Sequence, residues 1–397
     1  MANTLTCDLL IDACRDESFE SGMRYQVRLE PLAGVLTPVK PAIYEGGKYQ
    51  QDRRWEDSKD GPVRVEAVVV DNVPSQANRL EAALERIAQR VGLPQLILDF
   101  GDFVLPPHLP TTISCFRFPH RNADAYLRDS MLDGINLVKH AVGKDLFTAT
   151  PASPAALYRW MPQALLFGFW QSHLGKKGPQ TKVARSWVSE IVGLDPAGID
   201  ARQLGLKGDP FNLSIDSALE IDNEGLLKWE VSDEKRSGKS KNKESLSEIG
   251  HGQVPIGGDG PMAIAFRVIE QRATVSFASL RRIGGDTPEQ AASGRAVLVA
   301  LGLLAHANAF GSSFHLRSGT DLRAVEGGWT WLGSEEDRYL GSITAAMAEA
   351  LFTECVERAA AAGLPVGSVW ETRMLKPSDQ LAKVVTASYP ALDWDQA

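Results

Sequence analysis

The sequence has few cysteines and none of the paired arrangements that cysteine chemistry requires. Its four cysteines are scattered over 397 residues without a CxxC pair, so neither a disulfide framework nor a zinc knuckle is expected. Cys355 falls on the apolar face of a predicted helix, where a small buried thiol is the expected state. The seven histidines show no metal-ligand spacing either. The sequence therefore predicts no metal and no cofactor.

Long hydrophobic runs are also missing. The most apolar stretch, Ala296–Ala305, has ten residues, which suits a buried core helix rather than a bilayer span. The N-terminal segment places Asp8, Asp12 and Asp16 among its apolar residues and has no basic region, so no signal peptide is expected. We expect a cytoplasmic protein without a membrane partner. A hydrophobic content of 44% suffices for a sizeable core.

Motifs typical of catalytic sites are absent. The sequence has no P-loop, no GxSxG elbow, no HExxH helix and no GxGxxG turn that opens a helix. His306 falls in a predicted apolar helix and is expected to be a core residue. His251 lies between two glycines, where it could stack on a base, act as an acid or base, or fill a turn. The sequence therefore predicts a protein that is not an enzyme.

A net positive charge, which nucleic-acid-binding domains usually carry, is missing as well. The chain has 42 Lys and Arg against 50 Asp and Glu, a net charge of −8. Any RNA must therefore be bound in a local basic groove. Residues 172–187 contain Lys176, Lys177, Lys182 and Arg185 and no acidic residue. This stretch could line such a groove, or form a charged edge strand or helix face.

Hydrophobic patterns alternate between those of strands and those of helices. Thr287, Pro288 and Gln290 are typical of a helix start, and that apolar helix should run to Phe310. The other predicted elements are strands at 25–32, 63–70, 165–171 and 314–323, one or two strands within 263–277, and helices at 75–91 and 344–362. An α+β domain with an antiparallel sheet and helices on one face is the expected fold.

Two polar segments are predicted to be loops, and one aromatic segment is predicted to be core. Residues 38–62 are rich in charge, glycine and glutamine. The run 233–244 has too few apolar residues to repay the entropy of ordering, and is expected to be a solvated loop or a finger that orders on RNA or a neighbour. The aromatic residues between 154 and 170, including Phe167, Phe169 and Trp170, are expected to be buried.

Four segments resemble one known family. Asn72–Glu81 (NVPSQANRLE) resembles the family signature SQANR(L/M)E, and residues 120–134, 182–192 and 247–255 resemble three further family segments in the same order. The similarity extends from about residue 60 to residue 325. The family comprises the guide-RNA-binding backbone subunits (Cas-seven type) of type I-G, formerly I-U, CRISPR effector (Cascade) complexes, which are members of the RAMP superfamily.

The resemblance implies a modified RRM-like (ferredoxin-like) core in a single domain over residues 1–397, with insertions at 35–62 and 230–260. It also implies a non-catalytic subunit that polymerises with other copies of itself along CRISPR RNA. Such a subunit holds the guide for pairing with target DNA, together with the large and processing subunits of the complex. The alternative is a RAMP-type endoribonuclease that cuts guide precursor, with His251 as its acid or base. An unrelated metabolic enzyme would need a cluster of titratable groups, which the sequence does not offer.

A guide of arbitrary sequence must be held through phosphate and sugar, because base contacts would restrict it. Arg79, at the start of a predicted helix, could meet such an anion, or it could be a surface arginine beside a helix cap. Arg86 and Arg90 share its helix face and are expected to meet water. The full set of predicted RNA contacts is Ser75, Gln76, Asn78, Arg79, Lys182, Arg185, Ser186, Ser189, His251, Arg281, Arg282 and Arg317.

Overall fold

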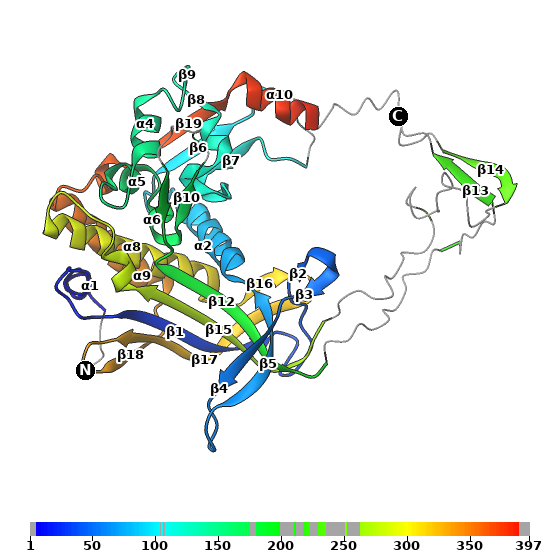
Figure 1. The fold of residues 1–397 in the computed structure, drawn as a ribbon, viewed down its shortest axis with the longest axis horizontal. Coiled ribbons are helices and arrows are strands. Elements are labelled where there is room, and N and C mark those ends of the chain that lie inside the picture. Colours follow the sequence, from blue (N-terminus) through cyan, green and yellow to red (C-terminus); the bar gives the residue numbers. More distant parts are fainter. Residues whose placement is uncertain are drawn as a thin grey trace.

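The computed structural model describes residues 5–103, 105, 108–172, 174, 180–198, 210–211, 217–221, 229–235, 251 and 263–388. An eight-stranded sheet forms one side of the fold, and helices cover one of its faces (Figure 1). A smaller lobe with its own sheet lies on the helix side of this main sheet (Figure 1). The predicted α+β class is confirmed.

The main sheet is entirely antiparallel. Its order is β16–β17–β1–β15–β12–β5–β4, and β18 pairs with β17. These strands are β1 (Gly22–Pro31), β4 (Gln51–Glu56), β5 (Val63–Asp71), β12 (Trp187–Pro196), β15 (Phe266–Ser276), β16 (Phe314–Arg317), β17 (Thr320–Leu332) and β18 (Asp337–Gly341).

Six elements reproduce the RRM-like core that the resemblance implies. Along the chain they are β1, α2 (Val73–Ile87), β12, β15, α8 (Pro288–Phe310) and β17, a β-α-β-β-α-β order. In space the four strands follow the order β17–β1–β15–β12. This is the ferredoxin-like arrangement. β5 and β4 extend it beyond β12, so the strand predicted at 63–70 lies inside the sheet and not at its edge.

Alternating burial along β1 shows which face the helices cover. Tyr25, Val27 and Leu29 are buried, whereas Gln26 and Arg28 between them are exposed. Because successive side chains of a strand point to opposite faces, the sheet face at β1 that the helices cover is apolar, while the opposite face of β1 is polar. On that second face, a small apolar cluster of Ala67, Val69, Val192 and Leu194 lies at β5 and β12. The covering helices are α1 (Cys7–Ala13), α2, α8 and α9 (Ala345–Ala361) (Figure 1).

The two long helices predicted from sequence are confirmed. Thr287 Oγ1 accepts a hydrogen bond from the Gln290 N–H at 3.1 Å, and Gln290 Oε1 accepts one from the Asp286 N–H at 2.7 Å. By length and composition α8 could cross a membrane, but 89% of its most apolar window is buried inside the protein. It is the core helix that the sequence predicted. Cys355, on α9, is fully buried as expected.

The smaller lobe was not predicted as a separate unit. Its sheet has the order β7–β6–β19–β8–β9, with β6 and β19 parallel. Its apolar residues belong to the same core cluster as those of the main sheet. The strands are β6 (Gln95–Asp99), β7 (Thr112–Ser114), β8 (Ser130–Leu132), β9 (Ile135–Asn136) and β19 (Thr372–Pro377). The helices are α3 (Ala125–Arg128), α4 (Ala141–Thr148), α5 (Ala155–Trp160), α6 (Pro162–Phe167) and α10 (Asp379–Ser388).

Three sequence predictions are wrong in detail. The segment 165–171 is not one strand, because α6 continues to Phe167 and only β10 (Phe169–Gln171) is extended. The segment 314–323 is a hairpin of β16 and β17 with a turn at Gly319, where φ is +77°. The loop predicted at 38–62 contains β4, which pairs with β5.

Short elements complete the described chain. β13 and β14 pair only with each other, and the rest of the insertion predicted at 230–260, including residues 236–244 of the low-complexity run, lies outside the described residues apart from His251. The remaining elements are β2 (Ile43–Tyr44), β3 (Lys48–Tyr49), β11 (Thr181–Val183), β13 (Ser217–Ile221), β14 (Trp229–Lys235) and α7 (Phe277–Leu280).

His306 makes stability depend on pH. Its ring packs against Tyr25, Trp187 and Trp329, and its Nε2 has no hydrogen-bond partner within the described chain. Burial lowers the pKa of His306 to about 3, against about 6.5 in an unfolded chain. Below pH 6.5 the unfolded state therefore binds a proton that the folded state does not.

We expect the free energy of unfolding to fall as the pH drops from about 6.5, with His306 contributing up to about 1.4 kcal/mol per pH unit. A His306→Leu variant should lose this part of the slope. Urea unfolding at pH 7, 6 and 5 measures it. Equal slopes in the variant and the wild type would contradict this role for His306.

Candidate nucleic-acid interface

Several predicted contact residues surround a buried carboxylate. Asp71, the last residue of β5, has no exposed surface. It accepts hydrogen bonds from Ser75 Oγ at 2.8 Å and from Arg79 Nε at 2.9 Å. Arg317 Nη2 donates to it at 2.9 Å, and Gln76 Nε2 donates to it as well. The structure therefore brings these four predicted residues together, but around an internal anion.

The two arginines of this network also bind backbone carbonyls. Arg79 Nη2 donates to the Leu316 carbonyl at 3.1 Å, and Arg317 Nη1 donates to the Val70 carbonyl at 2.9 Å. Burial lowers the pKa of Arg317, while the Asp71 carboxylate acts in the opposite direction. The network thus ties the start of α2 to β5 and to β16. RNA contact by Arg79 and Arg317 stays a prediction.

Three predicted contact residues, Gln76, Ser186 and Ser189, have hydrogen-bond partners inside the protein. Gln76 Oε1 accepts from Ser189 Oγ at 2.8 Å and from Gln271 Nε2 at 3.0 Å, and all three residues are buried. Ser186, also buried, makes a 3.0 Å hydrogen bond with the hydroxyl of Ser279. Gln76, Ser186 and Ser189 could reach RNA only by leaving these partners.

Arg281 is engaged in a similar way. Its Nη2 donates to the Ala13 carbonyl at 3.0 Å and its Nε to the Arg15 carbonyl at 3.0 Å. These are backbone groups at the end of α1, which a helix leaves without internal partners. Arg282 and Asn78 are exposed, and their contact with RNA stays a prediction.

Lys182 and Arg185 are different, because they border an open cavity. Lys182 lies on β11 directly opposite Trp170 of β10, with its Nζ 5.9 Å from the centre of the indole ring. Trp170 is 63% exposed, so the prediction that it belongs to the core is wrong. The cavity, called here the basic cavity, has a volume of about 890 Å³. Its lining residues are Pro119, His120, Arg121, Gly168, Phe169, Trp170, Ser172, Lys182, Val183, Ala184, Arg185 and Val188.

The basic cavity has an excess of positive charge. None of its described lining residues is acidic. Arg185 is exposed and, within the described chain, forms no ion pair. Partial burial and the charge of Arg121 lower the pKa of Arg185, while the charge of Glu81 raises it. Exposed cations beside an exposed aromatic face can bind phosphate and stack a base.

One lining residue of the basic cavity, Arg121, belongs to a buried ion pair. Arg121 Nε and Nη2 donate to the two carboxylate oxygens of Glu81, each at 2.8 Å, and Nη1 donates to the Gly168 carbonyl at 2.9 Å. Burial raises the pKa of Glu81 to about 7, and the Arg121 guanidinium opposes that rise. Arg121 also adopts a φ of +55°, which is uncommon for a non-glycine residue. The pair therefore joins α2 to the segment that carries His120.

Gly168 is required where α6 turns into β10. Its φ is +76°, and a Cβ there would lie 2.7 Å from the Val183 carbonyl oxygen and 2.9 Å from the Arg185 nitrogen. Any side chain would push β11 away from β10. The close approach places Lys182 and Arg185 beside the aromatic residues of β10.

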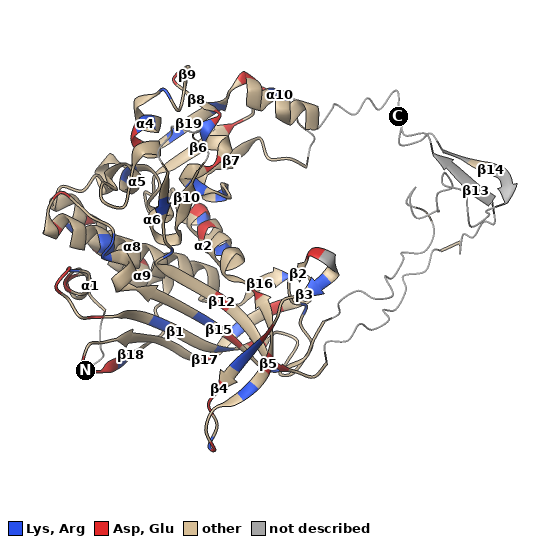
Figure 2. Ribbon diagram, viewed as in Figure 1, with Lys and Arg blue, Asp and Glu red and all other residues tan. Residues whose placement is uncertain are grey.

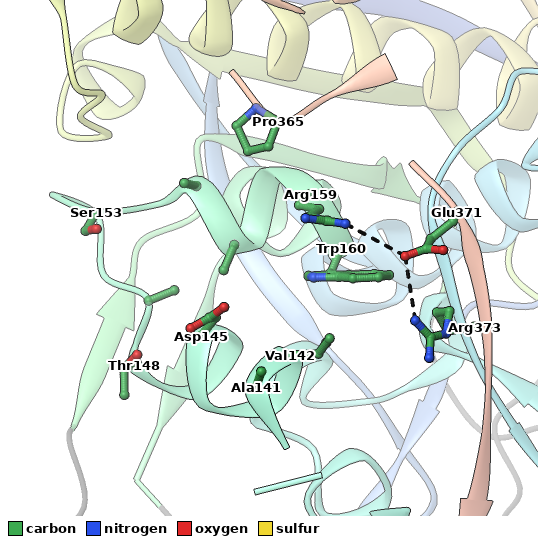
Figure 3. A pocket seen from close by; sticks show the side chains of 13 residues that line it. Ala141, Val142, Asp145, Thr148, Ser153, Arg159, Trp160, Pro365, Glu371 and Arg373 are labelled. Carbon is green, nitrogen blue, oxygen red and sulfur yellow. Dashed lines mark ion pairs between the residues drawn. The ribbon is translucent and has the colours of Figure 1, made fainter. Parts of the chain in front are cut away.

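A second cavity, of about 520 Å³, lies in the smaller lobe (Figure 3). Figure 3 shows Glu371 between Arg159 and Arg373, and its carboxylate is 3.8 Å from each guanidinium. Arg373 also pairs with Asp133 at 2.6 Å, and Arg159 lies over the Trp160 ring. Because carboxylates neutralise its cations, this cavity is a poorer site for phosphate.

Part of the predicted interface cannot be placed. His251 is exposed, but residues 236–250 and 252–262 around it lie outside the described residues, as do Lys176 and Lys177. The role of His251 therefore stays a prediction. Within the described chain, no group of three His, Cys, Asp or Glu residues could hold a metal ion.

Residues 23–197 match the model of a family described as "CRISPR-associated protein GSU0053". The match indicates a CRISPR-associated protein. It covers less than half of the chain, from β1 to just beyond β12. Asp71, Glu81, Arg121, Lys182 and Arg185 all lie within it. A search of curated protein sequences gave no match.

Four residues of the interface were missed as site residues by sequence reasoning. Trp170 was assigned to the core because its neighbours are apolar. Glu81, His120 and Arg121 lie within segments that resemble the family, yet no local pattern distinguishes a buried charge from an exposed one. The only available signal was an opposite-charge pair, Glu81 and Arg121, in two of these segments.

Removing the charge of Asp71 should destabilise the protein. In an Asp71→Asn variant, Arg79 and Arg317 lose their counter-charge in a site where water replaces it poorly. We expect a loss of about 3–5 kcal/mol in the free energy of unfolding, measured by urea denaturation. Asp145→Asn, which changes an exposed carboxylate, is the matched control and should cost less than about 0.5 kcal/mol. A similar small loss in both variants would contradict the role of Asp71.

Proposed function

We propose that the chain is a non-catalytic backbone subunit of a type I-G CRISPR effector complex, which assembles in several copies along CRISPR RNA in the cytoplasm. It holds the guide for pairing with target DNA and works with the large and processing subunits of that complex. The observation that carries the proposal is the basic cavity, which is lined in part by two of the segments that resemble the backbone family, 120–134 and 182–192.

The chemistry of the basic cavity suits single-stranded RNA of any sequence. Lys182 and Arg185 can pair with phosphates regardless of the base attached. Trp170 offers an exposed aromatic face, on which any base can stack. Neither a phosphate ion pair nor base stacking reads a base edge. The site would therefore tolerate the variety of guides that an effector complex must hold.

A local site also reconciles RNA binding with the acidic composition. Acidic and basic residues are interspersed along the described chain (Figure 2). On the open face of the main sheet, arginines pair with carboxylates, for example Arg54 with Glu190 and Arg272 with Glu270. Phosphate would therefore be attracted most strongly where cations lack such partners, as Lys182 and Arg185 do within the described chain.

Substitutions in the basic cavity should weaken RNA binding without sequence preference. For Lys182→Ala and Arg185→Ala we expect the slope of log K against log salt concentration to shrink by about 0.7 for each lost phosphate contact. For Trp170→Ala we expect a loss of about 1–3 kcal/mol if one base stacks there. Fluorescence anisotropy with two single-stranded RNAs of unrelated sequence, at four salt concentrations, measures both effects.

Arg64→Ala is the matched control, because Arg64 is an exposed arginine on β5 that does not line the basic cavity. It should leave the salt slope unchanged. If all the variants bind RNA as the wild type does, the basic cavity is not the RNA site.

The endoribonuclease alternative is tested separately. Purified protein and its His251→Ala variant are incubated with guide-precursor RNA, and the products are resolved on a denaturing gel. We expect no cleavage by either protein. Cleavage by the wild type that disappears in the variant would establish the alternative.

A further inference from the structure

A third cavity borders α2. It has a volume of about 380 Å³ and is enclosed by α2, the end of α8 and β16. Arg79, Ala82 and Arg86 of α2 line it, spaced three and four residues apart, so they share one helix face. Glu81 and Glu85, which bind Arg121 and Arg117, belong to the opposite flank. We call this space the α2–α8 cavity.

The lining of the α2–α8 cavity is rich in hydrogen-bond donors and has no described acidic residue. Arg86, Ser312 and Ser313 are exposed residues. Asn308 and His315 complete its polar lining. Arginine and hydroxyl groups that converge in this way are the donors with which proteins bind phosphate oxygens.

Arg86 is the cation available for a ligand. Within the described chain it makes no ion pair, whereas Arg90, four residues further on, pairs with Glu349 and Arg117 pairs with Glu85. Arg79 is held by Asp71 and forms a fixed wall of the cavity. A ligand would therefore gain a charge-assisted bond from Arg86 without breaking an existing ion pair.

Two features oppose an anion, and both are already compensated in part. The last carbonyls of α8 carry the negative end of its dipole, but the Ala307 carbonyl accepts from the Gly311 N–H at 3.0 Å and the Leu304 carbonyl from Asn308 Nδ2 at 2.8 Å. The second feature is the Asp321 carboxylate, which lies 2.8 Å from His315 Nδ1 and does not itself line the cavity. Ser312 Oγ donates to the Ser313 carbonyl at a long 3.3 Å. The exposed lining residues that can offer a ligand a charge or a hydroxyl are therefore Arg86, Ser312 and Ser313.

We propose that the α2–α8 cavity binds a phosphate group through Arg86, Ser312 and Ser313, either the phosphodiester of a nucleic-acid strand or free phosphate. This site is separate from the basic cavity, because the two cavities share no lining residue. It does not require the basic cavity to bind RNA. If the phosphate belongs to a strand, the protein holds nucleic acid at two separate places.

The test compares Arg86→Gln with Arg90→Gln, which removes an already paired arginine one helical turn further on. Single-stranded RNA binding is measured by fluorescence anisotropy, and inorganic phosphate binding by calorimetry. We expect Arg86→Gln to lose about tenfold in affinity for at least one probe, the typical value of one charge-assisted hydrogen bond. Arg90→Gln should bind both probes as the wild type does.

A variant that introduces a negative charge, Ser313→Asp, gives a second measurement that does not depend on removing Arg86. It places a carboxylate among the exposed lining residues and should repel either probe. Equal urea midpoints for wild type and variants show that folding is unchanged. A loss of RNA affinity identifies a phosphodiester, and a loss confined to inorganic phosphate identifies free phosphate.

Unchanged binding of both probes in Arg86→Gln and Ser313→Asp would overturn the proposal. The outcome is distinguishable from a failure of the proposed function. If Lys182→Ala and Arg185→Ala do not affect RNA binding while Arg86→Gln does, the basic cavity is not the RNA site. The α2–α8 cavity is then supported as a site for nucleic acid. The converse result supports only the basic cavity.

Discussion

The buried ion pair between Glu81 and Arg121 is the interaction on which the candidate interface depends. It crosses from α2, which packs on the main sheet, to the segment between β7 and α3 of the smaller lobe. A third hydrogen bond of Arg121 reaches the Gly168 carbonyl. Both partners are almost fully buried, so loss of either would leave an uncompensated charge at a cost of about 3–5 kcal/mol. The exposed cations of the basic cavity are thus positioned by a buried charge pair, one member of which, Arg121, lines the cavity.

The polar residues of the segments that resemble the family divide into two groups, one that holds the framework together and one that faces solvent. Those at the start of α2 and in the middle of β12 bond to one another around Asp71 and Gln76, and they fix the helix on the sheet. Those on β11 and after it, Lys182 and Arg185, face open space. A sequence signature can therefore mark the framework of a site as much as its contacts. The distinction matters for mutagenesis, because substitutions in the first group would change folding as well as binding.

The sequence predicted the regular parts of the fold well and the irregular parts poorly. The bounds of α8 and α9 followed from caps and terminal glycines, which act locally. The turn at Gly168 was missed because the apolar run around it fits a strand as well as a helix. The burial of Gln76 and Ser189 could not be predicted either, because these two residues bond to each other across 113 residues of sequence. Exposure of Trp170 likewise depends on how β10 and β11 sit on the rest of the protein.

The central claim is that this chain assembles along a guide RNA. The most direct measurement is to express it together with the large and processing subunits and a CRISPR array, purify it, and analyse its mass and its bound nucleic acid. We predict a multi-copy assembly that contains RNA of one discrete, guide-like length. A monomer free of nucleic acid under these conditions would contradict the account.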